Sequence, residues 1–219
     1  MLKKVFRNPK LKHLWPLVIY MICYLIWFGI VERVPRSSYF IIGSSFDRAI
    51  PFIEVFVVPY FSWFPFLVIW SLYLYFKDRD AYDCLATFLM IGMTVFLLVS
   101  TFFPNRLDLR LTSMPRNNIF TAMVAFLWKL DTPTDVWPSI HVYNTAAVEI
   151  MLLRSKDSWL QKKAVRFCLV LWGVLIILAT VFIKQHSIFD IITGFLMTGI
   201  VAWMTLERGI VFRFQKRKA

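Results

Sequence analysis

Two residues near the C-terminal end of the chain have the types and spacing of an oriented catalytic histidine. His186 and Asp190 are four positions apart, so they share one face if this segment is helical. A carboxylate that accepts a hydrogen bond from one imidazole nitrogen fixes the tautomer, and the other nitrogen can then act as a nucleophile or base. Asp190 lies in an apolar stretch, where an unpaired carboxylate is costly, and His186 is its obvious partner. The alternative is an Asp–His pair that only closes the end of a helix.

A second histidine, His141, lies at the start of another apolar stretch, directly after Pro138, Ser139 and Ile140. Pro and Ser before such a stretch are a helix-start signal, with Ser139 as the capping residue. The free N–H groups of a helix start bind anions, and His141 in the first turn is placed to donate a proton there. The sequence equally allows a solvent-facing helix start with an incidental histidine. For the remaining histidine, His13, a surface role in a basic segment is expected.

Three basic residues accompany these histidines. Arg106 and Arg110 follow a long apolar run, and Lys184 lies two positions before His186. An arginine can bind phosphate oxygens through two parallel N–H groups. An arginine that follows a membrane span is also commonly just an anchor to lipid headgroups, so each of these residues alone is weak evidence.

Taken together, these residues could transfer a phosphoryl group through a phosphohistidine. One histidine would attack phosphorus and the other would protonate the leaving oxygen, while the cations and helix-end amides neutralise the phosphate charge. The sequence has no cluster of carboxylates of the kind that binds a divalent metal. We therefore expect neither a metal nor a cofactor.

The composition is that of a membrane protein. Hydrophobic residues make up 59% of the chain, with 22 Phe and 9 Trp, against about 45–50% in a typical soluble domain. The formal charge of +12 is also compatible with nucleic-acid binding, but the basic residues form short clusters between apolar runs. That pattern is typical of loops beside anionic lipid headgroups, so we expect membrane lipids as partners and no nucleic acid.

The chain is expected to be all-α, with residues 1–219 forming a single integral membrane domain, a bundle of six transmembrane helices. A span needs about 20 apolar residues, and the expected spans are 14–31, 54–76, 84–103, 139–153, 164–183 and 187–206, of which 139–153 is short. With a cytoplasmic N-terminus, 17 of the 25 Lys and Arg residues fall in inner segments, as the positive-inside rule requires. We therefore expect both termini in the cytoplasm, with His141, His186 and Arg110 on the outer face.

At these residues the sequence resembles the membrane branch of the type 2 phosphatidic acid phosphatase (PAP2) superfamily. That family has six spans and three motifs, Lys-x6-Arg-Pro, Pro-Ser-Gly-His and Ser-Arg-x5-His-x3-Asp. Pro138-Ser139-Ile140-His141 matches the second motif with Ile in place of Gly, and His186 and Asp190 match the end of the third. Arg110 resembles the arginine of the first. The resemblance implies a nucleophilic His186 oriented by Asp190, His141 as general acid, and phosphate binding by Arg110 and Ser139.

The first and third motifs are incomplete. Phe103 stands at the lysine position and Leu111 at the proline position of the first motif, and Ala179-Thr180 replaces the Ser-Arg of the third. Two family cations are therefore absent. One hypothesis is that Lys184 and Arg106 replace them in space as phosphate ligands.

The resemblance implies a multi-pass protein of the cell membrane with its active site outside. Ile50-Pro51-Phe52, Val58-Pro59-Tyr60 and Trp63 resemble the second span of bacterial members, which implies a bacterial source. The implied activity is a metal-independent lipid phosphatase acting on a phosphatidate, phosphatidylglycerophosphate or polyprenyl-diphosphate type of substrate.

Two alternatives remain open. One is a phospho-headgroup transferase of the same fold, similar to inositolphosphoryl or phosphocholine transferases. The other is a small transporter, for which Glu149 is the main buried ionisable candidate. The sequence specifies neither the lipid nor the oligomeric state. Within residues 111–137 we also expect an amphipathic helix over the site.

Overall fold

The computed structural model describes residues 14–213, and it is mostly helical (70% helix, eight α-helices). An all-α fold is therefore confirmed. His13 lies outside the described residues. The helices are α2 (Leu14–Arg33), α3 (Ser45–Ala49), α4 (Val57–Lys77), α5 (Arg79–Phe102), α6 (Ile119–Leu130), α7 (Ile140–Arg154), α8 (Lys163–Phe182) and α9 (Ile188–Ala202). Short elements are η1 (Glu54–Phe56), the π-helical η2 (Trp203–Glu207), and the parallel strands β1 (Phe40–Ile42) and β2 (Asn105–Leu107).

Within residues 14–213, five helices are long and apolar enough to cross a membrane: α2, α4 with η1, α5, α8, and α9 with η2. The predicted short span 139–153 corresponds to α7, which is not among these five. Its 15 residues span ~22 Å, less than the ~30 Å of a bilayer core. The chain is thus a candidate membrane protein by helix length and composition, and the count of six spans is not confirmed.

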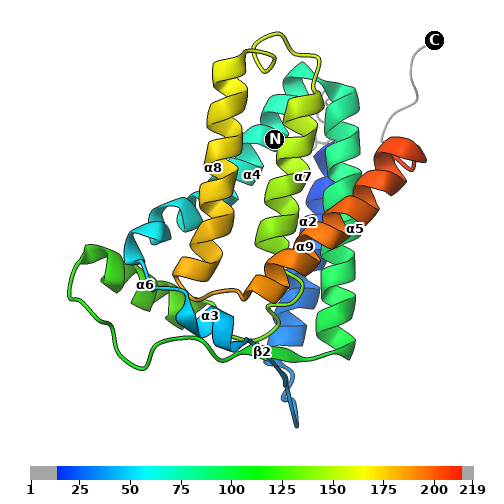
Figure 1. Ribbon diagram of the computed structural model, residues 1–219. Coiled ribbons are helices and arrows are strands. Elements are labelled where there is room, and N and C mark those ends of the chain that lie inside the picture. Colours follow the sequence, from blue (N-terminus) through cyan, green and yellow to red (C-terminus); the bar gives the residue numbers. More distant parts are fainter. Residues whose placement is uncertain (1–13, 214–219) are drawn as a thin grey trace, which may run out of the picture.

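Helix α7 is the central helix of the bundle. It contacts α4, α5, α8 and α9, and Figure 1 shows it between α8 and α5. Its neighbours shield it, so it can carry buried polar residues such as Asn144 and Thr145, which are disfavoured on a lipid-facing helix. This position explains why α7 is less apolar than the surrounding helices.

A close contact between α5 and α7 depends on Gly92. The buried Tyr143 packs directly against this glycine and donates a hydrogen bond from its hydroxyl to the Phe88 carbonyl (2.7 Å). A Cβ atom at position 92 would lie 2.0 Å from the Tyr143 ring. The absence of a side chain at Gly92 therefore lets the central helix approach α5.

We expect Gly92→Ala to destabilise the protein by ~1–3 kcal/mol, the usual cost of overpacking a core. Gly199→Ala is the matched control, because its added Cβ would meet nothing within 4 Å. Thermal unfolding in detergent should show a lower midpoint for Gly92→Ala only. Equal midpoints for the two variants would mean that the packing described for Tyr143 is wrong.

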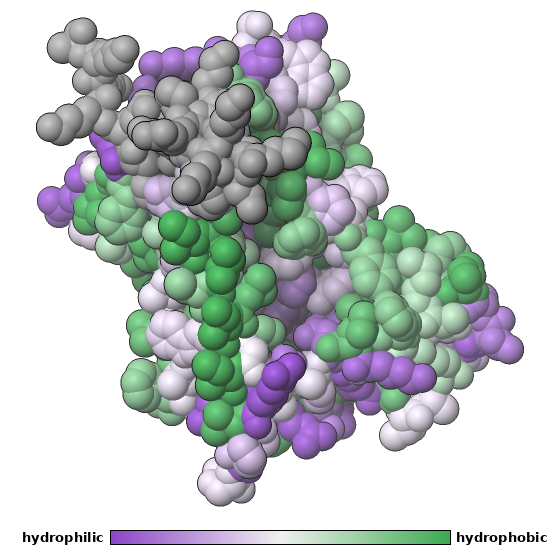
Figure 2. Space-filling model, turned by 180° about the vertical axis from the view of Figure 1, so that it is seen from behind, coloured by the Kyte–Doolittle hydropathy of each residue, from purple (hydrophilic) through white to green (hydrophobic). Residues whose placement is uncertain are grey.

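The segments that connect the long helices lie at two opposite ends of the molecule. Elements α3, β2 and α6 gather at one end, and the α4–α5 and α7–α8 connections lie at the other (Figure 1). Figure 2 shows hydrophobic residues across the middle of one face and hydrophilic residues along its lower rim. The end that carries α3 and α6 also holds the candidate site.

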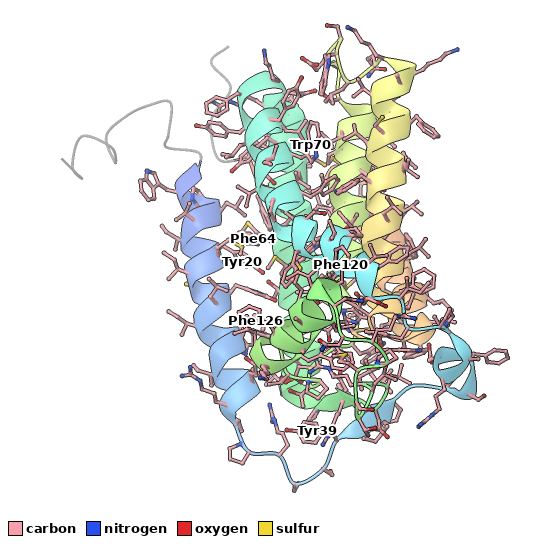
Figure 3. The ribbon with its side chains drawn as sticks, turned by 90° about the vertical axis from the view of Figure 1, so that its left-hand side faces the viewer. Tyr20, Tyr39, Phe64, Trp70, Phe120 and Phe126 are labelled. Atoms are coloured by element: carbon pink, nitrogen blue, oxygen red, sulfur yellow. The ribbon has the colours of Figure 1, made fainter. Side chains whose placement is uncertain are left out.

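Helix α6 is the amphipathic helix expected within residues 111–137. Its N-cap residue, Asn118, accepts a hydrogen bond from the Thr121 amide and forms a capping box with it. Figure 3 shows α6, with Phe120 and Phe126, in front of the lower half of the bundle. Val124 and Leu127 are buried, whereas Phe126 is 56% exposed, so the helix presents apolar side chains both to the bundle and away from it.

Candidate active site

His186 and Asp190 meet at the start of α9, as their spacing predicts. Ser187 caps the helix and accepts a hydrogen bond from the Asp190 amide (3.1 Å), while Asp190 Oδ2 accepts one from the Ser187 amide (2.8 Å). This capping box fixes the carboxylate, which is fully buried. The same Oδ2 lies 3.3 Å from Nδ1 of His186. The local sequence therefore holds the imidazole in one orientation.

The second imidazole lies against the first. Nδ1 of His141 is 3.1 Å from Nε2 of His186, although the two residues belong to different elements. Since Asp190 accepts from Nδ1–H of His186, Nε2 of His186 carries the lone pair, and Nδ1–H of His141 is the donor in this contact. The arrangement therefore places the Nε2 lone pair of His186 against a proton carried by His141.

Two aromatic residues of α4 hold the His141 ring. The Tyr60 ring is stacked on it with centroids 4.8 Å apart, and the Trp63 ring centroid lies 4.1 Å away. Both rings pack against the imidazole and fix its orientation. Their spacing of three places both rings on one face of the helix, a signal that the sequence analysis used only for its family resemblance.

Ser139 caps α7 as predicted, accepting a hydrogen bond from the Val142 amide (3.4 Å). The residue is fully buried. A Cβ at Gly194 of α9 would lie 3.1 Å from the Ser139 carbonyl, so the starts of α7 and α9 pack closely. This packing brings the two histidine-bearing segments together.

Arg110 points into the same region from the loop after β2. Its Nη1 donates to the Trp128 carbonyl (3.0 Å) and its Nη2 to Oε1 of Gln185 (2.7 Å). Its Nε is buried and has no hydrogen-bond partner among the described residues. Burial lowers the pKa of Arg110, but a guanidinium stays charged at any physiological pH. Arg110 is therefore a cation bonded to Gln185, the residue before His186, and its Nε–H is free to donate.

Lys184 and Arg106 have other positions than the hypothesis of replacement cations requires. The Lys184 Nζ is buried and donates to the Asp47 and Ile50 carbonyls (2.7 and 2.6 Å), and burial lowers the pKa of Lys184. Arg106 is exposed on β2, in register with Ile41. Lys184 thus binds the segment that follows β1. Within residues 14–213, neither side chain forms a hydrogen bond with His141 or His186.

Two further polar residues line the site, and the sequence analysis did not identify them. Gln185 connects Arg110 to Asp131, because its Nε2 donates to Asp131 Oδ2 (3.2 Å) while its Oε1 accepts from Arg110. Asp131 is the C-cap residue of α6 and interacts electrostatically with His186. Their only sequence signals were the position of Gln185 beside His186 and a carboxylate at the end of an amphipathic helix.

A pair of histidines with an orienting carboxylate lies at one end of an apolar helical bundle, an arrangement compatible with phosphoryl transfer. Residues 111–214 match the family model of the PAP2 superfamily, and this match supports membership of that superfamily. The matched range contains Ser139, His141, His186 and Asp190, and Arg110 directly precedes it. No curated protein and no solved structure matches the chain. Members of the superfamily are generally phosphatases, which suggests phosphatase-type activity.

Proposed function

We propose that the protein is a metal-independent lipid phosphatase that hydrolyses a lipid phosphomonoester or diphosphate through a phosphohistidine intermediate. The observation that carries the proposal is the continuous contact from Asp190 through His186 to His141, with Arg110 at hydrogen-bonding distance from the adjacent Gln185. Between residues 14 and 213, His, Cys, Asp and Glu form no group of three or more that could hold a metal ion.

The contacts of the two histidines support the following steps. The Nε2 lone pair of His186 attacks phosphorus, and the bond from phosphorus to the ester oxygen of the lipid breaks. That oxygen takes a proton from the imidazolium form of His141, which becomes a neutral imidazole. Water then attacks the phosphohistidine and gives its proton to His141, and the bond from phosphorus to nitrogen breaks to release phosphate. Arg110 stabilises the negative charge on the phosphate oxygens during both steps.

An apolar groove supports a lipid as the substrate. It lies between α4 and α8, has a volume of about 600 Å³, and includes Ser62, Ile69, Trp70 and Trp172 among its lining residues. Ser62, one of the lining residues, directly precedes Trp63, whose ring contacts His141. An acyl or polyprenyl chain in this groove would leave its phosphate at the level of the histidines.

We further propose that α7 is the sixth span and that the site faces outward. Its ends lie near opposite ends of the bundle (Figure 1), and the surrounding helices would shield its short length from lipid. Both chain termini would then be cytoplasmic, which agrees with the distribution of basic residues. A topology map that puts residues 104–138 and 184–190 on opposite sides would refute both the orientation and the site.

The test is phosphate release by the purified protein in detergent, with a phosphatidate or polyprenyl diphosphate as substrate and an excess of chelator. We expect turnover that chelator does not reduce and that vanadate inhibits, because vanadate mimics the pentavalent phosphorus of the transition state. Activity that disappears with chelator and returns with a divalent cation would contradict a metal-independent mechanism.

A second candidate is transfer of a phospho-headgroup from a donor lipid to an acceptor alcohol. It is favoured by the charge of the site, where Gln185 and Thr180 are neutral and Asp131 is acidic. A phosphodiester has one negative charge and needs fewer cations than a phosphomonoester. Product analysis with and without an acceptor alcohol separates the two, since a transferase releases little free phosphate.

A further inference from the structure

We propose that Asp131 is a specificity-determining residue that makes the site favour a phosphate ester with one negative charge over one with two. This inference rests on the proposed function, because it concerns the phosphate that would bind between Arg110 and His186. The first and third motifs are incomplete and do not indicate which charge state of the phosphate the site binds. The inference specifies that charge state.

The position of Asp131 is fixed by α6 and by Gln185. Its backbone amide donates to the Leu127 carbonyl at the end of the helix, and its Oδ2 accepts from Gln185 Nε2 (3.2 Å). The other side of the Gln185 amide accepts from Arg110. Because one amide group joins both charged residues, the carboxylate is held close to the cation that would bind phosphate.

The charged and titratable groups around Asp131 come from four elements. They are Arg110 from the loop after β2, His186 from the α8–α9 connection, Tyr60 from α4 and Glu32 from α2. Burial raises the pKa of Asp131, whereas Arg110 and His186 act to lower it. Only one group in this set, Arg110, is permanently cationic, so its charge is offset by the ionised carboxylate.

Other nearby cations are engaged elsewhere. Lys184 binds two backbone carbonyls. Arg116 forms two hydrogen bonds with the Glu54 carboxylate (2.7 and 2.6 Å). A phosphate between Arg110 and His186 would therefore meet one guanidinium and one carboxylate. In a partly buried site each extra negative charge beside a carboxylate is strongly disfavoured.

Two kinds of phosphate ester have one negative charge. A phosphodiester has a single charge at any neutral pH, and a phosphomonoester has a single charge only below its second pKa of about 6. The preference therefore predicts that phosphodiesters bind equally well at acidic and neutral pH, and that phosphomonoesters bind best at acidic pH. Both kinds present a singly charged phosphate to the site. Comparing the binding of a diester with that of a monoester at neutral pH distinguishes them.

The experiment measures binding to the purified protein in detergent, without requiring catalysis. The probes are dodecylphosphonate, at a pH where it has two charges, and its monomethyl ester, which has one. In both probes a carbon–phosphorus bond joins the dodecyl chain to phosphorus. Attack at phosphorus therefore cannot release the chain as an alkoxide. The variants are Asp131→Asn, which removes the charge, and Asp131→Glu, which keeps it. Asp108→Asn is the matched control, since Asp108 is exposed at the same end of the molecule and pairs with Arg48 (3.9 Å).

We expect the wild-type protein to bind the singly charged ester at least about 10-fold more tightly than the dianion, equivalent to one unit of pKa. Asp131→Asn should tighten binding of the dodecylphosphonate dianion about 10-fold with little change for the singly charged monomethyl ester. Asp131→Glu and Asp108→Asn should retain the preference. Equal effects of Asp131→Asn on both probes, or no effect on either, would overturn the proposal. Because the readout is binding, an inactive but discriminating protein would refute the proposed function and leave this inference standing.

Discussion

Replacing His186 by alanine should reduce turnover of a lipid phosphate by at least ~10⁴-fold, because the variant lacks the nitrogen that attacks phosphorus. Among the described residues, His186 is the only histidine whose ring is hydrogen-bonded to a carboxylate, through Nδ1, and its Nε2 faces His141. The measurement is kcat for phosphate release under chelator, with thermal unfolding in detergent to verify that the variant is folded.

Chemical rescue separates loss of the nucleophile from loss of structure. Added imidazole should enter the space left by the side chain and restore part of the turnover of His186→Ala. It should not restore a variant that lacks Asp190, because the ring is still present there. Full activity of His186→Ala without imidazole would refute the mechanism.

Asp190→Asn should reduce kcat by ~10³–10⁴-fold while substrate binding changes little. An amide of the same shape cannot accept the hydrogen bond from Nδ1–H of His186 in the same way, so the ring loses its preferred tautomer and orientation. The Asp190 carboxylate is fully buried, and its Oδ2 accepts from both His186 Nδ1 and the Ser187 amide. The measurement is a comparison of kcat with the KM of the same substrate.

Ser187→Ala is the matched control for this prediction. It removes the other half of the capping box, which typically costs ~1 kcal/mol of stability, and it leaves the carboxylate beside His186. We expect Ser187→Ala to lower the unfolding midpoint with a much smaller loss of kcat. If both variants lost the same activity, Asp190 would act only as a helix cap.

The parts of the site that depend on short-range spacing could be predicted from the sequence. His186 and Asp190 are four positions apart, and Ser139 precedes an apolar helix. Helical geometry alone then determines which side chains meet and which residue caps. The predicted spans also put His141 and His186 on the same side of the membrane, but the sequence did not specify that their rings are in contact.

The positions of the cations could not be predicted, because they depend on backbone turns and on tertiary contacts. Lys184 has a positive φ of 58°. It lies in the turn after α8, where the Gln185 and His186 amides both donate to the Thr180 carbonyl. Its side chain extends to the segment around Asp47 instead of the histidines. No periodicity in the sequence specifies such a turn. The spacing of two between Lys184 and His186 therefore did not predict where the Lys184 side chain lies.

Asp131 and Gln185 were missed for a similar reason. Their contact joins the end of α6 to the α8–α9 connection, 54 positions apart in sequence. The sequence predicted an amphipathic helix over the site, but amphipathicity does not reveal which polar residue at its end faces inward. The number of spans could not be predicted for the same reason. Whether α7 can lie in the membrane depends on the helices packed around it and not on its own hydrophobicity.

The central claim is that the phosphoryl group is transferred to His186. The most direct test is rapid acid-free quenching of the enzyme with a ³²P-labelled aryl phosphate, whose leaving group needs little protonation, followed by mapping of the labelled residue. We predict a base-stable, acid-labile phosphohistidine at His186 that accumulates in His141→Gln, where hydrolysis of the intermediate lacks its base, and that is absent in His186→Ala. Label on another residue, or turnover of substrate without any labelled intermediate, would contradict the account.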